Sequence, residues 1–292
     1  MSKITHMAGK AIELLKRPRF VKESVRTSAY PGMKELFQGK VVLITGATSG
    51  IGFASAWQYL EAGAKVIITG RNRDKLAAAL QQLEKVGRDR VKGVLWDISD
   101  FQQLHSKLEE CIECFGKLDI LVNNAGVNKK ADGSNFSGWE DVTCEDWDYV
   151  MNINLKATYF LIQAVAKCWI AEGEGNKHIV NVLSGSAYKP AIAPYGTSKW
   201  GVRGITEGFG KRLAPFGIIV NGIAPGPTAT AMGNVSDNSE TLKAPNIPAQ
   251  RMSVVEEIAN TIVYLSSDYC NTIVGETVRK DGGYSLTTLG EC

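Results

Sequence analysis

The sequence predicts one doubly wound α/β domain, in which helices cover both faces of a parallel sheet of about seven strands. Three observations lead to this class. From residue 40 onward, short apolar runs of strand length alternate with amphipathic stretches of helical period. The runs are mostly apolar and do not alternate strictly with polar residues, which is typical of strands buried on both faces. The 292 residues, 44% of them hydrophobic, are enough for one large core.

The elements follow in order along the chain. The expected strands are Lys40–Thr45, Lys65–Thr69, Val91–Trp96, Ile120–Asn123, Ile179–Leu183, Ile218–Ile223 and Thr272–Thr277. Helices are expected from a glycine turn to about Ala62, along the stripe Leu76, Leu80 and Leu83, over Phe101–Phe115, from near Thr143, over Tyr195–Ala214, and after Ser253. The pairs Ser99/Gln102, Thr143/Asp146 and Ser253/Glu256 predict helix caps.

The charge is unevenly distributed. Residues 1–34 carry eight Lys and Arg against two Glu, a balance of +6, which leaves −3 for the rest of a chain whose net charge is +3. This distribution favours no nucleic-acid partner for the domain. We expect residues 1–37 to be a basic extension, either an arm on the protein's own oligomer or a disordered segment, and residues 38–292 to be the domain. No apolar run is long enough for a membrane span.

The six cysteines follow an intracellular pattern without a secretory signal, so we expect reduced thiols and a cytoplasmic location. Cys111 belongs to an apolar helical stripe with Leu104 and Leu108. We therefore interpret Cys111 and Cys114 as part of a helix face, and we expect no metal site.

A glycine-rich segment, TGATSGIG at Thr45–Gly52, joins the first strand to the first helix of the domain. Gly46 permits a tight turn, while Gly50 and Gly52 allow close approach of the backbone to a pyrophosphate. The free N–H groups of a helix N-terminus favour such an anion. This arrangement predicts a Rossmann-type dinucleotide site formed by Gly46, Thr48, Ser49, Gly50, Ile51 and Gly52.

The end of the second strand distinguishes the two common dinucleotides. Sites that prefer NAD place a carboxylate there for the ribose 2′-hydroxyl. Here the stretch reads Thr69-Gly70-Arg71-Asn72-Arg73, without an acid. The guanidinium of Arg71 can bind a 2′-phosphate, so the predicted cofactor is NADP(H). Pairing of Arg71 or Arg73 with Asp74 is the alternative.

Tyr195 and Lys199 lie four residues apart at the start of a helix and share one face. An adjacent ammonium is expected to lower the pKa of the phenol and make it an acid or base for proton transfer. Ser184, after the fifth strand, is expected to hold a substrate oxygen. Asn154, in the long helix, is expected to order a water that relays protons to Lys199.

These residues and motifs resemble the short-chain dehydrogenase/reductase family over about residues 38–285. The resemblance rests on TGATSGIG, Asp97 in DISD, NNAG at Asn123–Gly126, Asn154 in MNINL, Ser184, YGTSK, NGIAPGPTAT at Asn221–Thr230 and VRKDGG. It implies that Asp97 and Ile98 flank the adenine and that Asn123, within the motif ending at Gly126, contacts the adenosine ribose. It also implies that Lys199 holds the nicotinamide ribose and that Thr228, after Pro225 and Gly226, contacts the carboxamide.

The chain departs from the family pattern in two places besides the extension. The spacing from Ser184 to Tyr195 is about two residues shorter than usual, which leaves Ser186 as an alternative oxygen-holding residue. The segment Val127–Thr143 is several residues longer and forms either a pocket wall or a surface loop.

The expected function is that of an NADP(H)-dependent oxidoreductase that transfers hydride between the nicotinamide and a carbonyl or secondary alcohol. A 3-oxoacyl thioester, a steroid-like ketone and a sugar or polyol are all compatible substrates. The alternative is a non-catalytic dinucleotide sensor. A homodimer or homotetramer is expected, and the face of Gly204 and Gly208 packs either across a subunit interface or within the monomer.

Overall fold

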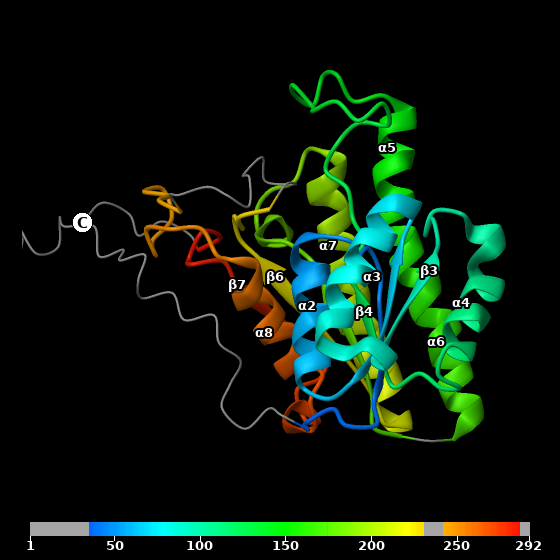
Figure 1. Cartoon of the computed structure of the whole chain (residues 1–292). Helices are drawn as coiled ribbons and strands as arrows, with labels where there is room; N and C mark the ends of the chain where they lie inside the picture. The colour runs from blue at the N-terminus through cyan, green and yellow to red at the C-terminus, as the bar shows by residue number, and fades with distance from the viewer. Residues whose placement is uncertain (1–34, 174, 231–241, 287–292) are drawn as a thin grey trace, which may run out of the picture.

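The computed structural model describes residues 35–173, 175–230 and 242–286. Seven parallel strands form one sheet in the order β3-β2-β1-β4-β5-β6-β7 (Figure 1). Their bounds are β1 Val41–Ile44, β2 Lys65–Gly70, β3 Val91–Leu95, β4 Ile120–Asn123, β5 Lys177–Val182, β6 Ile218–Pro225 and β7 Thr277–Lys280. The order reverses between β1 and β4, where ligands of such sheets bind. The predicted fold class is confirmed.

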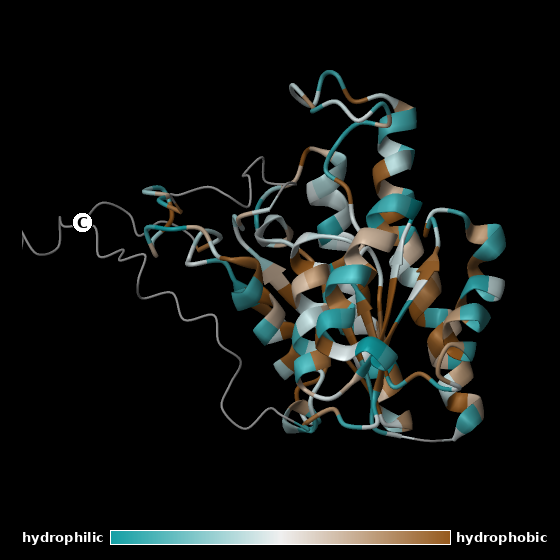
Figure 2. Ribbon diagram, viewed as in Figure 1, coloured by the Kyte–Doolittle hydropathy of each residue, from teal (hydrophilic) through white to brown (hydrophobic). Residues whose placement is uncertain are grey.

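Helices cover both faces of the sheet. One face packs against α2 (Gly50–Glu61), α3 (Arg73–Gly87) and α8 (Val255–Leu265), and the other against α4 (Leu104–Glu113), α6 (Ala157–Glu172) and α7 (Pro194–Leu213). Alternation along β1 shows why: Val42 and Ile44 belong to the first core, Val41 and Leu43 to the second. The apolar strands therefore lie between two helical layers (Figure 2).

The predicted long helix is interrupted near its middle. It begins as α5 (Cys144–Met151), widens into a π-helical turn at Asn152–Lys156, and continues as α6. The predicted capping box is confirmed, because the Thr143 side chain accepts from the Asp146 backbone and the Asp146 carboxylate accepts from Thr143. Single π turns of this kind often occur at functional sites.

Two other caps differ from the prediction. The Ser99 hydroxyl donates to Asp97, and Asp100 caps a short 3₁₀ turn that precedes α4. At α8 the capped backbone N–H is that of Val254, one residue after Ser253, and its acceptor is the Glu257 carboxylate. Local spacing therefore located the helix starts to within a few residues but named the wrong side chains.

The last strand begins five residues later than Thr272. The side chain of Asn221 on β6 accepts from the Glu276 N–H and donates to the Ile273 carbonyl, and Gly275 adopts a left-handed φ of 73°. These contacts hold the chain in a loop, so pairing with β6 begins only at Thr277.

Part of the N-terminal extension lies within the described residues. Phe37 is buried, and its ring packs edge-on against Tyr59 at 5.2 Å. This contact anchors the start of the domain to α2. The rest of the expected arm, residues 1–34, lies outside the described residues, and its role stays a prediction.

Among the described helices, none is both long and apolar enough to cross a bilayer. The five cysteines of the described segments are free thiols, as expected for a reduced chain. Cys111 is buried in the core of the second face, which confirms the predicted apolar stripe.

His178 on β5 is a titratable group within the core. It is buried, and neither ring nitrogen makes a well-formed hydrogen bond. Burial lowers the pKa of His178 to about 4; Lys40 also lowers it, and Asp268 and Asn271 oppose the shift. Below pH 6.5 the unfolded chain therefore binds a proton that the folded protein excludes until about pH 4, so stability falls as the pH falls through this window.

Replacing His178 with Phe should remove this pH dependence. Between pH 7 and pH 5 the wild-type free energy of unfolding should fall by about 2 kcal/mol more than that of the His178→Phe variant. Urea denaturation at the two pH values measures the difference. His105→Phe, at an exposed histidine of α4, is the matched control and should behave as wild type. Parallel pH profiles for His178→Phe and wild type would contradict the assignment.

Candidate active site

The four predicted catalytic residues come together at the carboxyl end of the sheet. Ser184 follows β5, Asn154 lies in the π turn, and Tyr195 and Lys199 occupy the first turns of α7. Pro194 at the first position of α7 suits the start of a helix. The Lys199 ammonium nitrogen lies 5.7 Å from the centre of the Tyr195 ring.

Lys199 is a buried cation with a defined partner. Its Nζ donates to the Val182 carbonyl at 2.9 Å, and only 4% of the residue is exposed. Burial lowers the pKa of Lys199 to about 8. The ammonium form still dominates at neutral pH, so the site carries a positive charge beneath the phenol.

The pKa of Tyr195 shifts in the direction opposite to the one expected. Burial raises it, and the hydrogen bond with Ser184 offsets part of the rise. Lys199 is not among its causes. A neighbouring ammonium would lower the pKa, but placing a phenolate away from water costs free energy, which spacing along the helix does not reveal. With the protein groups alone, Tyr195 is therefore a neutral phenol, which is a proton donor.

Ser184 and Ser186 have different surroundings. The Ser184 hydroxyl lowers the pKa of Tyr195, accepts from the Ser186 N–H at 3.1 Å and donates to the Ser186 hydroxyl at 3.3 Å. In these hydrogen bonds, Ser184 is the one catalytic candidate that Ser186 contacts. The geometry favours Ser184 as the oxygen-holding residue.

Asn154 braces the site through its side chain. Its Oδ1 accepts from the Val127 N–H at 2.8 Å, and its Nδ2 donates to the Val127 carbonyl and to the Ser198 hydroxyl. A Cβ on Gly126 would lie 3.3 Å from this Oδ1 and 3.5 Å from the Lys199 Nζ. Asn154 therefore joins the turn after β4 to α7, and its predicted water relay stays a prediction.

The glycine-rich turn fits a pyrophosphate. Gly46 has a φ of 64°, and a Cβ there would lie 2.8 Å from the Ala125 backbone. The Ser49 side chain does not cap α2, whose first turn contains Gly50, Ile51 and Gly52 and carries no acid. The N–H groups at this helix end are thus left to an anion.

Asn124 is a site residue that the sequence argument missed. Its Nδ2 donates to the carbonyls of Thr45 and Gly46 at 2.9 Å, and its N–H donates to the Thr45 hydroxyl. These bonds hold the glycine-rich turn against the end of β4. The second asparagine of NNAG was the available signal.

The residues predicted to surround the adenosine half of the cofactor lie in different environments. Asp97 accepts from the N–H and hydroxyl of Ser99, and Ile98 packs at the edge of the second core. The Thr48 methyl fills the space where a Cβ on Gly70 would lie, and Arg71 follows directly. Asn123, however, is buried and donates to Asn181 on β5. Its side chain joins two strands, and the expected contact with the adenosine ribose stays a prediction.

The residues predicted to contact the nicotinamide follow β6 in the chain. Gly226 permits close contact with the turn at Asp281, because a Cβ there would lie 2.7 Å from the Asp281 Cα. The Thr228 hydroxyl donates to the Gly226 carbonyl at 2.9 Å, and the strand segment at Thr228 bridges to Ser253. Pro225 ends β6. Residues 231–241, which follow this segment, lie outside the described part.

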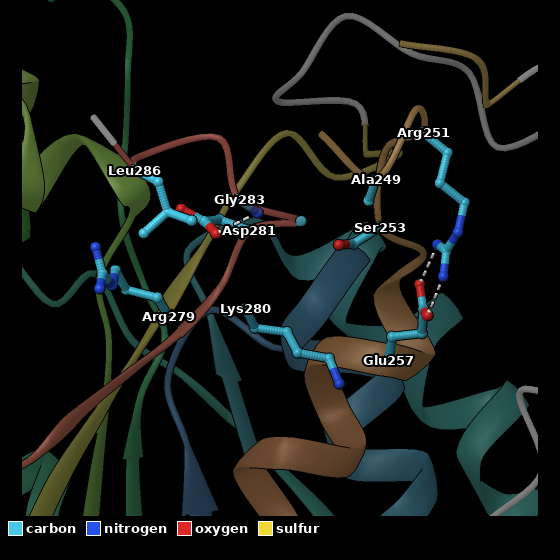
Figure 3. Close-up of a pocket in the computed structure, with 10 residues that line it drawn as sticks. Ala249, Arg251, Ser253, Glu257, Arg279, Lys280, Asp281, Gly283 and Leu286 are labelled. Atoms are coloured by element: carbon cyan, nitrogen blue, oxygen red, sulfur yellow. Dashed lines mark hydrogen bonds and ion pairs between the residues drawn. The ribbon is translucent and has the colours of Figure 1, made fainter. Parts of the chain in front are cut away.

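A cavity of about 480 Å³ lies beside this end of the sheet (Figure 3). Its walls include the ion pair of Arg251 with Glu257, at 2.6 and 2.7 Å, together with Lys280 and Asp281. None of the predicted catalytic side chains lines it. This cavity is therefore separate from the predicted catalytic side chains.

The long segment Val127–Thr143 is internally braced. Lys130 pairs with Asp141 at 2.8 Å, and the Ala131 N–H donates to Asp146 on α5. The segment projects beyond the start of α5 at the top of the view (Figure 1), and Trp139 is 59% exposed. These contacts describe an ordered surface loop.

Comparison with known proteins identifies the family. The sequence model of the short chain dehydrogenase family matches residues 40–241 of this chain. Dehydrogenase/reductase SDR family member 4 of Caenorhabditis elegans is 34% identical over 255 residues, which cover 85% of this chain and 95% of that protein.

Solved structures agree. A gluconate 5-dehydrogenase from Burkholderia cenocepacia, in complex with NADP and tartrate, is 30% identical with a TM-score of 0.76, covering 88% of this chain and 99% of its own. A 3-ketoacyl-(acyl-carrier-protein) reductase from Brucella melitensis, complexed with NADH, is 29% identical with a TM-score of 0.74. The match covers 85% of this chain and 99% of that protein. The chain belongs to the short-chain dehydrogenase/reductase family and is an oxidoreductase acting on CH–OH groups.

Proposed function

We propose that this enzyme is an NADP(H)-dependent carbonyl reductase in which Tyr195 protonates the oxygen of the reduced substrate. The observation that carries the proposal is the partly buried Tyr195 phenol, whose pKa Ser184 lowers and whose ring centre lies 5.7 Å from the Lys199 ammonium. A bound nicotinamide would supply the hydride. Asn154, Ser184, Tyr195 and Lys199 would supply the remaining chemistry.

Each residue has a distinct task. Ser184 donates a hydrogen bond to the substrate oxygen and so holds it at the phenol. Tyr195 transfers its proton as negative charge develops on that oxygen, and the Lys199 ammonium supplies positive charge 5.7 Å from the ring centre. The raised pKa of Tyr195 favours the reductive direction, because a neutral phenol is the form that donates.

The substrate is best sought among polar carbonyl compounds. The two solved relatives carry the names of a gluconate dehydrogenase and a 3-ketoacyl-carrier reductase, so sugar acids and 3-oxoacyl thioesters come first in a panel that also contains steroid-like ketones and polyols. Incubation with NADPH and each compound, followed through cofactor absorbance, identifies the class. A catalytic role is favoured over a sensor role because all four reacting groups are assembled. The cytoplasmic location stays a prediction.

Tyr195→Phe tests the proton donor. Turnover should fall by a factor on the order of 10² to 10⁴, because no other acid replaces the phenol. NADPH affinity, measured by fluorescence titration, should stay within about twofold, since only the hydroxyl is removed. Tyr269→Phe, at a tyrosine 74% exposed, is the control. Turnover retained in Tyr195→Phe would exclude the assigned role.

A pair of alanine variants separates the two serines. Ser184→Ala should lower kcat by roughly 10²-fold, the order expected when a hydrogen bond to the reacting oxygen is lost. Ser186→Ala should lower it far less, because its hydroxyl acts only through Ser184. Steady-state kinetics on one substrate measure both. The reverse ranking would assign the oxygen to Ser186.

Arg71→Ala tests the cofactor preference. Loss of a charge-assisted hydrogen bond to the 2′-phosphate should raise the KM for NADPH by about tenfold or more. The KM for NADH, which lacks that phosphate, should change little. Arg73→Ala, at the exposed first residue of α3, is the matched control. Equal effects on both cofactors would remove the basis for preferring NADP(H).

The proposed homodimer or homotetramer uses the face of α6 and α7. A Cβ on Gly204 or Gly208 would meet no described atom within 4 Å, whereas Gly210 packs against Gly275. Tyr159 and Phe160 on α6 are each 39% exposed. These two glycines therefore make no tight packing contact within the described monomer, which supports the interface over the intramolecular alternative.

Gly208→Glu should disrupt this assembly without unfolding the chain. Replacing a helical glycine raises helix propensity by up to about 1 kcal/mol, while the added carboxylate is costly to bury between subunits. Sedimentation velocity should show a smaller species with an unchanged or higher melting temperature. Ala78→Glu, on the exposed face of α3, is the control. A monomeric wild type, or an unchanged assembly of Gly208→Glu, would contradict the proposed interface.

A further inference from the structure

Arg71 makes one side-chain hydrogen bond among the described residues, and it crosses between two separate elements. Its Nη2 donates to the Tyr149 hydroxyl at 3.2 Å, although the residues lie 78 positions apart. Arg71 belongs to the turn between β2 and α3, while Tyr149 lies on α5. The Thr48 methyl of the glycine-rich turn packs against Gly70, directly before Arg71. The contact therefore lies beside the anion-binding turn.

The partner is notable for being uncharged. The alternative expected from sequence was an ion pair with Asp74, yet no such pair forms within the described segments. A carboxylate partner would orient the guanidinium and also neutralise it. A phenol orients the guanidinium but leaves its positive charge for an incoming anion.

The hydrogen-bonding capacity of the pair also remains incomplete. A tyrosine hydroxyl that accepts from arginine still has its own proton to donate, and a guanidinium has five N–H donors. Of these, one Arg71 donor contacts Tyr149, and the described residues provide no acceptor for the Tyr149 proton. An exposed arginine also loses rotamer freedom when it binds a ligand, and a contact made beforehand reduces that loss.

We propose that Tyr149 is a positioning residue for the 2′-phosphate of the cofactor, acting by holding Arg71 in place without neutralising it. The proposal rests on the NADP(H) preference argued above and adds a second residue to it. It differs from a chance surface contact in one respect. A chance contact has no influence on phosphate selectivity, whereas a positioning contact affects the 2′-phosphate and leaves the rest of the nucleotide alone.

The test uses two nucleotides that differ only by the 2′-phosphate, adenosine 2′,5′-bisphosphate and adenosine 5′-monophosphate. Their dissociation constants are measured by calorimetry on the full chain. Tyr149→Phe should weaken binding of the bisphosphate about fivefold, as expected for loss of one hydrogen bond of ordinary strength, and leave the monophosphate within about twofold. Tyr269→Phe, at an exposed tyrosine far from Arg71 in the sequence, is the matched control.

A double-mutant cycle checks that Tyr149 acts through Arg71. In an Arg71→Ala background, Tyr149→Phe should cause no further weakening of bisphosphate binding. The proposal is overturned if Tyr149→Phe leaves bisphosphate binding unchanged, weakens both nucleotides equally, or weakens bisphosphate binding equally with and without Arg71.

Failure of the cofactor assignment gives a different pattern. If wild type binds both nucleotides equally and Arg71→Ala changes neither, the NADP(H) preference itself is wrong. If wild type prefers the bisphosphate and Arg71→Ala removes that preference, but Tyr149→Phe does not reduce it, the preference stands and only the role of Tyr149 is excluded.

Discussion

The burial of the Lys199 ammonium is the constraint on which the site depends. A cation removed from water must be hydrogen-bonded, and Lys199 has the Val182 carbonyl at the end of β5 as its acceptor. Its neighbours leave it room: Gly126 has no side chain, and Asn154 keeps the turn after β4 at a fixed separation from α7. Strand ends, turn and helix are thus arranged around one charge.

Much of this arrangement follows from the sequence because it depends on local signals. Apolar runs located six of the seven strands, and the order of motifs placed Ser184, Tyr195 and Lys199 at one edge. The seventh strand was misplaced because the loop before it is held by Asn221, a residue more than fifty positions earlier. The contact between Asn123 and Asn181 was likewise not foreseen, since Asn181 lies on a neighbouring strand.

The pKa of Tyr195 illustrates a second limit. Spacing along a helix identifies which charges are near each other, but it does not say how much water reaches them. At Tyr195 burial outweighs the effect of Ser184 on the pKa, and at Lys199 burial alone accounts for the pKa shift. Desolvation depends on every element packed around a group, so it becomes visible only in the folded structure.

The π-helical turn at Asn152–Lys156 has a consequence for the whole length of the α5–α6 segment. A π turn contains one residue more than an α turn, so it rotates the residues before it by about 100° relative to those after it. The face of α6 that packs into the core and the face of α5 that carries Tyr149 are thereby out of phase. Deleting one residue there would straighten the segment into a regular helix and turn Tyr149 away from the β2–α3 loop, although no residue of that loop had changed.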